Sequence, residues 1–264
     1  MSDILGLTPK VSIEEIWKNI RYTDDRYNEF QFTHCDERNL VLLGRSRTGK
    51  STVAKVMEDV FHFSEERALF AQTKQIEFHK VKTGTGEGRH YYFNIIDVPG
   101  FFDISIDVKQ TLSNDQVTQF INKCISQSVC NIHLFAFVFS LNGGINEQDI
   151  AAMIYTRNHF KDLSTNMALI ITNCEQSTTK QREDLCSNFF EHETVKKNQL
   201  KDFFKQGVFF MGCLRKESHD QANPQSIQNE YDNVLEMRDK WITKCIETTT
   251  PYNIHHKGKQ CLIS

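Results

Sequence analysis

The apolar residues along this chain gather in short runs that predict β-strands. Four runs are almost continuously apolar, which is typical of strands buried on both faces of a parallel sheet. These runs are residues 39–43, 132–139, 167–171 and 207–211. Two further runs, 76–81 and 91–96, alternate between apolar and polar positions around a glycine-rich tip, and this pattern predicts a hairpin.

Helical periodicity fills the segments between these strands. After the first strand, Val53, Val56, Met57 and Val60 fall on one helical face. Further helices are predicted over about residues 115–128, 179–204 and 226–246, with another that ends near residue 160. Because strands alternate with helices, we expect an α/β fold. Its core is a doubly wound, mostly parallel sheet with helices on both faces and a ligand at the carboxyl ends of the strands.

The segment between the first strand and its helix has the pattern G-x-x-x-x-G-K-[ST] of a phosphate-binding loop. In such a loop, backbone N–H groups and the helix N-terminus face one bound anion. Lys50 is placed to reach the β- and γ-phosphates, and the Ser51 hydroxyl to ligate Mg²⁺. The predicted loop residues are Gly44, Arg45, Ser46, Arg47, Thr48, Gly49, Lys50, Ser51 and Thr52.

A second motif follows the predicted hairpin. The strand at 91–96 ends in D-V-P-G, which begins at Asp97 and ends at Gly100. In phosphate-loop GTPases, a D-x-x-G at this point holds a Mg²⁺-bound water with its carboxylate and meets the γ-phosphate with its glycine N–H. Thr73 precedes the hairpin, where a switch threonine binds Mg²⁺ and the γ-phosphate. An ordinary loop threonine is the alternative interpretation of Thr73.

Composition narrows the class of protein. The chain has 264 residues and a net charge of −3, so no broad basic surface for nucleic acid is indicated. The eight cysteines form no C-x-x-C pair, which favours reduced thiols in a cytoplasmic setting. The N-terminus lacks the pattern of a signal peptide, and no apolar run is long enough to span a bilayer.

The two ends of the chain lie outside the predicted core. Residues 1–37 are interpreted as an N-terminal helix and connector, in which the apolar stripe at 12–20 either packs on the domain or binds a partner helix. Residues 247–264 are interpreted as a tether. The chain ends in Cys261-Leu262-Ile263-Ser264, a C-a-a-X box of the kind that is farnesylated. We therefore expect lipidation at Cys261 and attachment to the cytosolic face of a membrane.

These motifs together resemble the immunity-associated, avirulence-induced (AIG-type) GTPases, which are related to septins and to chloroplast-translocon GTPases. The resemblance covers roughly residues 38–245, within a G domain expected at 38–246. It depends on the phosphate loop, Thr73, the D-V-P-G-F-F-D segment at 97–103, and the glycine-containing box at 141–149. It implies binding of GTP or GDP with Mg²⁺ held by Ser51 and Thr73.

The resemblance also places the guanine base. T-N-C-E at 172–175 stands where a looser version of the base-reading [NT]-K-x-D motif is expected. A carboxylate there accepts the N1–H and N2 amino protons of guanine, and adenine offers no such pair. The missing lysine weakens packing on the base, so guanine is favoured. Beyond the loop, the residues expected to bind the nucleotide are Asp97, Gly100, Thr172, Asn173, Glu175 and Cys213.

Slow hydrolysis is expected. In Ras-like GTPases a glutamine just after D-x-x-G orients the attacking water, and here Phe101 takes that place. Gly144 stands where some family members carry an arginine. The catalytic residues are therefore expected to be Lys50, Thr73 and Arg47, with Arg47 either lying along the phosphates or pointing to solvent. The family's GTP-dependent dimers, which pair through the nucleotide face, imply a homodimer or oligomer.

Three functions stay open at this point. The first is a slowly hydrolysing GTPase that acts as a switch or a self-assembling scaffold at a membrane. The second is an assembly protein that binds GTP with negligible hydrolysis. The third, an ATP-using phosphotransferase, is disfavoured because no separate set of substrate-binding arginines is apparent.

Overall fold

The computed structural model describes residues 14, 18, 35–63, 76–84, 89–99, 130–140, 146–215 and 224–254. Several sequence predictions lie outside these residues and stay predictions. They are the helix at 115–128, Thr73, Gly100, Phe101, Gly144, Cys261 and most of the helix at 12–20, of which residues 14 and 18 are described and are helical.

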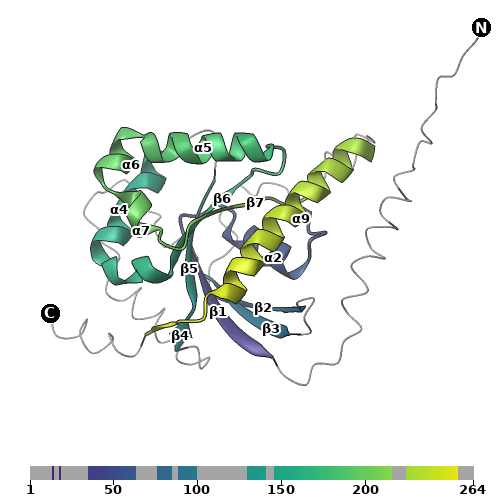
Figure 1. Ribbon diagram of the computed structural model, residues 1–264, viewed down its shortest axis with the longest axis horizontal. Helices are drawn as coiled ribbons and strands as arrows, with labels where there is room; N and C mark the ends of the chain where they lie inside the picture. The colour runs from purple at the N-terminus through teal and green to yellow at the C-terminus, as the bar shows by residue number, and fades with distance from the viewer. Residues whose placement is uncertain are drawn as a thin grey trace, which may run out of the picture.

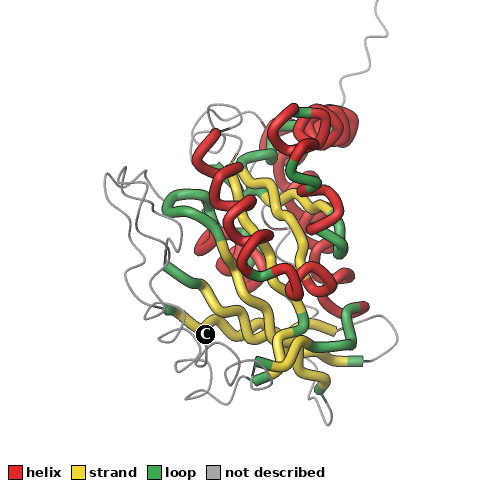
Figure 2. Tube along the Cα trace, turned by 90° about the vertical axis from the view of Figure 1, so that its left-hand side faces the viewer, coloured by secondary structure: helices red, strands yellow, loops and turns green. Residues whose placement is uncertain are grey.

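A six-stranded sheet forms the centre of the domain, in the order β2-β3-β1-β5-β6-β7 (Figure 1). All neighbouring strands are parallel except β2, which runs antiparallel to β3. Figure 2 shows the strands running side by side. The prediction of a mostly parallel α/β sheet is therefore confirmed. The strands are β1 (Asp36–Leu43), β2 (Glu77–Gly84), β3 (His90–Asp97), β5 (Leu134–Ser140), β6 (Met167–Thr172) and β7 (Val208–Met211).

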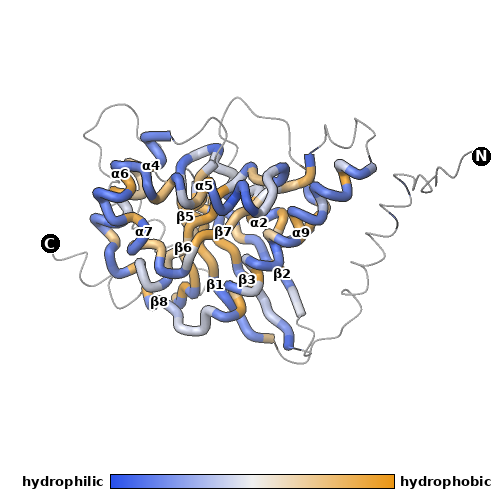
Figure 3. The backbone as a smooth tube through the Cα atoms, turned by 45° about the horizontal axis from the view of Figure 1, so that its top comes forward, coloured by the Kyte–Doolittle hydropathy of each residue, from blue (hydrophilic) through white to orange (hydrophobic). Residues whose placement is uncertain are grey.

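Helices cover both faces of this sheet. Helices α2 and α9 lie together on one face, and α4, α6 and α7 lie on the other (Figure 1). The central strands are consequently buried on both faces, and Figure 3 shows them as the apolar interior between more polar helices. The helices are α2 (Lys50–Glu58), α4 (Glu147–His159), the 3-10 helix η1 (Lys161–Asn166), α5 (Thr179–Glu191), α6 (Glu193–Lys197), α7 (Leu200–Phe203) and α9 (Pro224–Glu247).

Two predicted elements are divided in the structure. The run at 132–139 is split into β4 (Asn131–Ile132) and β5, because the His133 imidazole accepts a hydrogen bond from the Asn39 backbone N–H. The helix predicted over 179–204 is three helices. The chain leaves the helical conformation at His192, and Gln199 has a left-handed backbone with φ 48°.

The predicted tether begins later than residue 247. Tyr252 and Asn253 form β8 (Tyr252–Asn253), which pairs antiparallel with β4, and Ile254 is buried in the core. The Asn166 side chain donates a hydrogen bond to the Thr250 carbonyl at 2.9 Å. Residues 248–254 therefore pack on the domain, because their backbone groups and one apolar side chain find partners there.

Gly44 brings the start of the phosphate loop against strand β5. Its φ is +135°, and a Cβ built on it would lie 2.3 Å from the Val138 carbonyl oxygen. Gly207, just before β7, also has a positive φ of +100°, but a Cβ there would meet only the ring of Phe209 at 3.7 Å. A side chain at either glycine would strain the backbone, but only a side chain at Gly44 would also clash with a neighbouring strand.

We expect Gly44→Ala to destabilise the nucleotide-free protein more than the matched control Gly207→Ala. Backbone strain costs each variant about 1–3 kcal/mol. Gly44→Ala adds about 1–3 kcal/mol for crowding against a backbone carbonyl that has little room to move. Urea unfolding of the two variants measures the difference, and equal losses would show that the contact with Val138 is unimportant.

Candidate functional site

The phosphate loop connects β1 to α2 at the carboxyl edge of the sheet. Gly49 has a left-handed backbone at the N-cap of α2, and no acidic side chain lies in the first turn of that helix. The Lys50 side chain curls back under the loop, where its ammonium donates to the carbonyls of Gly44 at 3.0 Å and Arg45 at 2.7 Å. A buried ammonium and a helix N-terminus therefore face the same loop, which is the arrangement that binds phosphate.

The end of β6 contacts this loop through Thr172. The Thr172 hydroxyl donates to the Thr48 carbonyl at 2.7 Å, and a Cβ on Gly49 would lie 3.2 Å from the Thr172 side chain. The Thr48 hydroxyl in turn donates to the Arg45 carbonyl at 2.9 Å. The Thr172 hydroxyl thus contacts the phosphate loop, and a contact of Thr172 with the base stays a prediction.

Asp97 and Ser51 lie together where β3 meets the start of α2. The Asp97 carboxyl is fully buried, and its Oδ2 accepts a hydrogen bond from the Ser51 hydroxyl. Its Oδ1 is also buried and has no hydrogen-bond partner among the described residues. Burial raises the pKa of Asp97, although the hydrogen bond from Ser51 and the charge of Lys50 oppose that rise.

The Asp97–Ser51 pair fits a hard divalent cation. Mg²⁺ prefers oxygen ligands, and this corner offers the Ser51 hydroxyl beside the Oδ2 of a buried carboxyl. A cation there also offsets the cost of a buried carboxylate. Ser51 as a metal ligand stays a prediction, and its hydroxyl lies beside the Asp97 carboxyl.

Two arginines of the loop differ in their surroundings. Arg45 makes a partly buried ion pair with Asp149 in the first turn of α4, with 3.5 Å between Nη1 and Oδ1. The sequence analysis missed this contact, because the two residues are far apart in the chain. Arg47 is exposed and has a left-handed backbone with φ 65°. Of the two positions considered for Arg47, the structure shows the one that points to solvent.

Glu175 follows β6 and, together with the segment after β7, forms one wall of the candidate site. It is only 8% exposed, and a Cβ built on Gly212 would lie 2.8 Å from its Oε2. The backbone after β7 therefore approaches this carboxylate closely, and the buried Cys213 belongs to the same wall. The pKa of Glu175 is raised by burial, with partial opposition from a hydrogen bond to its own backbone and from the charge of Arg215.

Arg215 and Glu230 position this wall, and the sequence analysis did not find them. The Glu230 carboxylate on α9 accepts from the Arg215 backbone N–H at 2.6 Å and from its Nε at 3.2 Å. The same Nε lies 3.9 Å from Glu175 Oε1. Asn233, also on α9, donates to the Glu175 carbonyl at 3.1 Å. Helix α9 thereby fixes the segment that holds Glu175.

Asn173 lies between the two halves of the site. It has a left-handed backbone with φ 61°, and its side-chain amide donates to the Ser140 hydroxyl at 2.6 Å. Asn173 is exposed, whereas its neighbours Thr172 and Glu175 are buried. The carboxyl ends of β5 and β6 therefore present one exposed polar side chain at the edge where the ligand of a doubly wound sheet binds.

The fold and this site define a phosphate-loop G domain. The loop follows β1, the Asp97 carboxyl ends β3, and the T-N-C-E segment ends β6 on the other side of β1. A family model confirms the resemblance inferred from the motifs: the description "AIG1 family" matches residues 38–239, and the chain belongs to that family. In keeping with this family, the domain is a GTP-binding G domain.

Two individual proteins are similar to the chain. Immune-associated nucleotide-binding protein 13 of Arabidopsis thaliana is 32% identical over 114 residues, which are 43% of this chain and 31% of that relative. The chain thus matches about a third of the relative's length. The crystal structure of a dimerization-deficient mutant of Toc33 from Arabidopsis thaliana has a TM-score of 0.45 and 16% identity, covering 86% of this chain and 91% of Toc33.

No helix in the described part of the chain is both long enough and apolar enough to cross a membrane.

Proposed function

We propose that this protein binds GTP with Mg²⁺, hydrolyses it slowly, and acts as a nucleotide-dependent switch or self-assembling scaffold at a membrane. The observation that carries the proposal is the phosphate loop, in which the buried Lys50 ammonium and the N-terminus of α2 face one anion position. The buried Asp97 carboxyl, which accepts the Ser51 hydroxyl at its Oδ2, lies at the same corner and supports a bound cation. Ser51 and Thr73 are the proposed Mg²⁺ ligands.

Guanine recognition is assigned to Glu175. Its carboxylate is buried beside the backbone of Gly212 and Cys213, where water competes little for its oxygens. Guanine presents two adjacent N–H donors to a carboxylate, whereas adenine presents a donor and an acceptor. Hydrogen bonds to a charged group contribute about 1.5–3 kcal/mol each, so this pair is strong enough to set base preference.

We expect Glu175→Gln to weaken GTP binding at least about tenfold while ATP binding stays unchanged, since tenfold corresponds to about 1.4 kcal/mol. Competition calorimetry against bound GDP measures both nucleotides. Glu183→Gln, an exposed position on α5, is the matched control and is expected to behave like wild type. Equal displacement of GDP by ATP and GTP in the wild-type protein would contradict guanine specificity and favour an ATP-using phosphotransferase.

The same carboxylate gives GTP binding a pH dependence. Only the ionised form accepts both guanine donors, and burial raises the pKa of Glu175 above its ordinary value. GTP affinity should therefore be constant above the raised pKa of Glu175 and fall as the pH drops through it. This fall should occur at a higher pH than it would for an exposed glutamate. Isotherms across acidic pH check this, and Glu175→Gln should lack the step.

Slow hydrolysis is proposed from the residues found at two positions of the sequence. Phe101 replaces the water-orienting glutamine of Ras-like GTPases, and Gly144 replaces an arginine of some family members. Arg47 is exposed on the loop, so its guanidinium is available to a second copy that docks on the nucleotide face. A GTP-dependent dimer would exclude water from the site and bring that charge toward the phosphates.

The hydrolysis rate distinguishes this proposal from a GTP-binding assembly protein. The isolated monomer should turn over near 10⁻⁴ s⁻¹, about as slowly as Ras alone. The rate per site should rise with protein concentration in wild type and stay flat in Arg47→Ala. Single-turnover measurements across a wide concentration range test this, with Arg157→Ala on α4 as the matched control. No detectable hydrolysis at any concentration would favour the assembly protein, and a fast, concentration-independent rate would contradict both.

Membrane attachment is proposed through prenylation of Cys261. One prenyl chain binds membranes only marginally, so a second signal such as self-association or the basic residues 255–259 has to contribute. The mass of the C-terminal peptide from a prenylating cell tests this, and an unmodified peptide would contradict it.

A further inference from the structure

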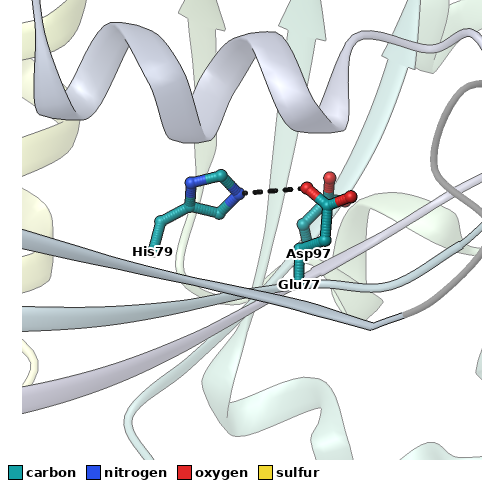
Figure 4. A group of neighbouring side chains, drawn as sticks. All are labelled: Glu77, His79 and Asp97. Atoms are coloured by element: carbon teal, nitrogen blue, oxygen red, sulfur yellow. Dashed lines mark ion pairs between the residues drawn. The ribbon is translucent and has the colours of Figure 1, made fainter.

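A second cluster of titratable side chains joins β2 to β3 and shares Asp97 with the Mg²⁺ corner. Glu77 and His79 are two positions apart on β2, so their side chains leave the same face of the strand. In the antiparallel register Glu77 lies directly opposite Asp97. Figure 4 shows the His79 imidazole directed toward the carboxylates of Glu77 and Asp97. One potential ligand atom from each residue lies within 4.8 Å of the other two.

Two atoms of this cluster are buried without a hydrogen-bond partner among the described residues. They are Oδ1 of Asp97 and Nε2 of His79. Asp97 is fully buried, and His79 Nε2 lies 3.8 Å from Glu77 Oε2, which is beyond hydrogen-bond distance. An unsatisfied buried polar group costs about 1–3 kcal/mol, so two of them side by side indicate a missing partner for both.

The negative charges of the cluster also favour a bound cation. Two carboxylates directly opposite each other on antiparallel strands repel, and here one of them is out of water. The pKa of Asp97 is raised by burial and, to a smaller extent, by Glu77. A positive ion between the strands removes the repulsion and satisfies the unpaired oxygen in a single step.

We propose that Glu77, His79 and Asp97 form a binding site for a first-row transition-metal ion of the Zn²⁺ type. Imidazole nitrogen suits Zn²⁺ and its neighbours in the series, whereas Mg²⁺ and Ca²⁺ prefer oxygen ligands alone. Three protein ligands leave a fourth position for water, as in open zinc sites. The site goes beyond the proposed function and does not need a nucleotide, although it shares Asp97 with the Mg²⁺ corner.

The two oxygens of Asp97 allow this sharing. Oδ2 is bonded to the Ser51 hydroxyl, whereas Oδ1 has no hydrogen-bond partner. Zinc ligands at bonds of about 2.0 Å stand roughly 3.3 Å apart in a tetrahedron, so the cluster has to contract slightly. The Glu77 side chain is 52% exposed and has the freedom to do so. A bound ion, with ligands from both strands, would then link the edge strand β2 to β3 beside the nucleotide site.

The test is a Zn²⁺ titration of the full chain. The protein is loaded with GDP, kept in millimolar Mg²⁺ and reducing agent, and followed by calorimetry. We expect a site of one ion per chain that is weakened at least tenfold in His79→Gln. His90→Gln, which removes a histidine from β3 of the same hairpin, is the matched control and should bind Zn²⁺ like wild type. GDP affinity in Mg²⁺ should be unchanged in both variants.

Two further measurements keep the proposal falsifiable. If His79→Gln loses GDP binding, its loss of Zn²⁺ has no clear cause, and Glu77→Gln is used in its place. The Glu77 side chain is half exposed, so this substitution tests the site without disturbing the fold. Co²⁺ should bind without a thiolate charge-transfer band, because no cysteine belongs to the cluster. The metal site would be overturned if the wild-type protein bound no ion or if a thiolate band appeared. It would also be overturned if His79→Gln and Glu77→Gln bound Zn²⁺ as tightly as wild type. Failure of GDP binding in the wild-type protein would instead overturn the proposed function.

Discussion

The burial of one ammonium group under a backbone loop is the constraint on which the rest of the site depends. Lys50 is 6% exposed, and a buried charge is tolerated only where hydrogen bonds surround it. The loop therefore curves so that the carbonyls of Gly44 and Arg45 accept from its Nζ. That curve requires the positive φ of Gly44 and its close approach to Val138, and the Thr172 hydroxyl holds the loop from below.

Two buried carboxyls stand at the ends of strands on opposite sides of β1. Asp97 ends β3 and Glu175 follows β6, and burial raises the pKa of each. Each buried carboxylate is costly in the protein alone, and the proposed ligands would offset that cost: a cation at Asp97, and the N–H donors of guanine at Glu175. The proposed ion between β2 and β3 extends the same principle, because His79 offers a buried nitrogen beside a carboxylate oxygen without a partner.

The sequence predicted the parts of this molecule that depend on local pattern. Continuous apolar runs gave the buried strands, and the spacing of glycines around Lys50 gave the loop, because a phosphate cradle needs those residues in a fixed order. Contacts set by strand register and helix packing were missed. The Arg45–Asp149 pair, the Arg215–Glu230 pair and the Glu77–His79–Asp97 cluster join segments whose spacing in the chain carries no signal.

The most direct test of GTP binding by this loop is calorimetry of Lys50→Ala against GTP in the presence of Mg²⁺. Removal of the ammonium leaves the β- and γ-phosphates without their principal positive charge, so we expect tight binding to be lost while the protein stays folded. Lys55→Ala, one turn further along α2, keeps the same helix and loop and should bind GTP like wild type. Comparable GTP affinity in wild type and Lys50→Ala would contradict nucleotide binding at this loop.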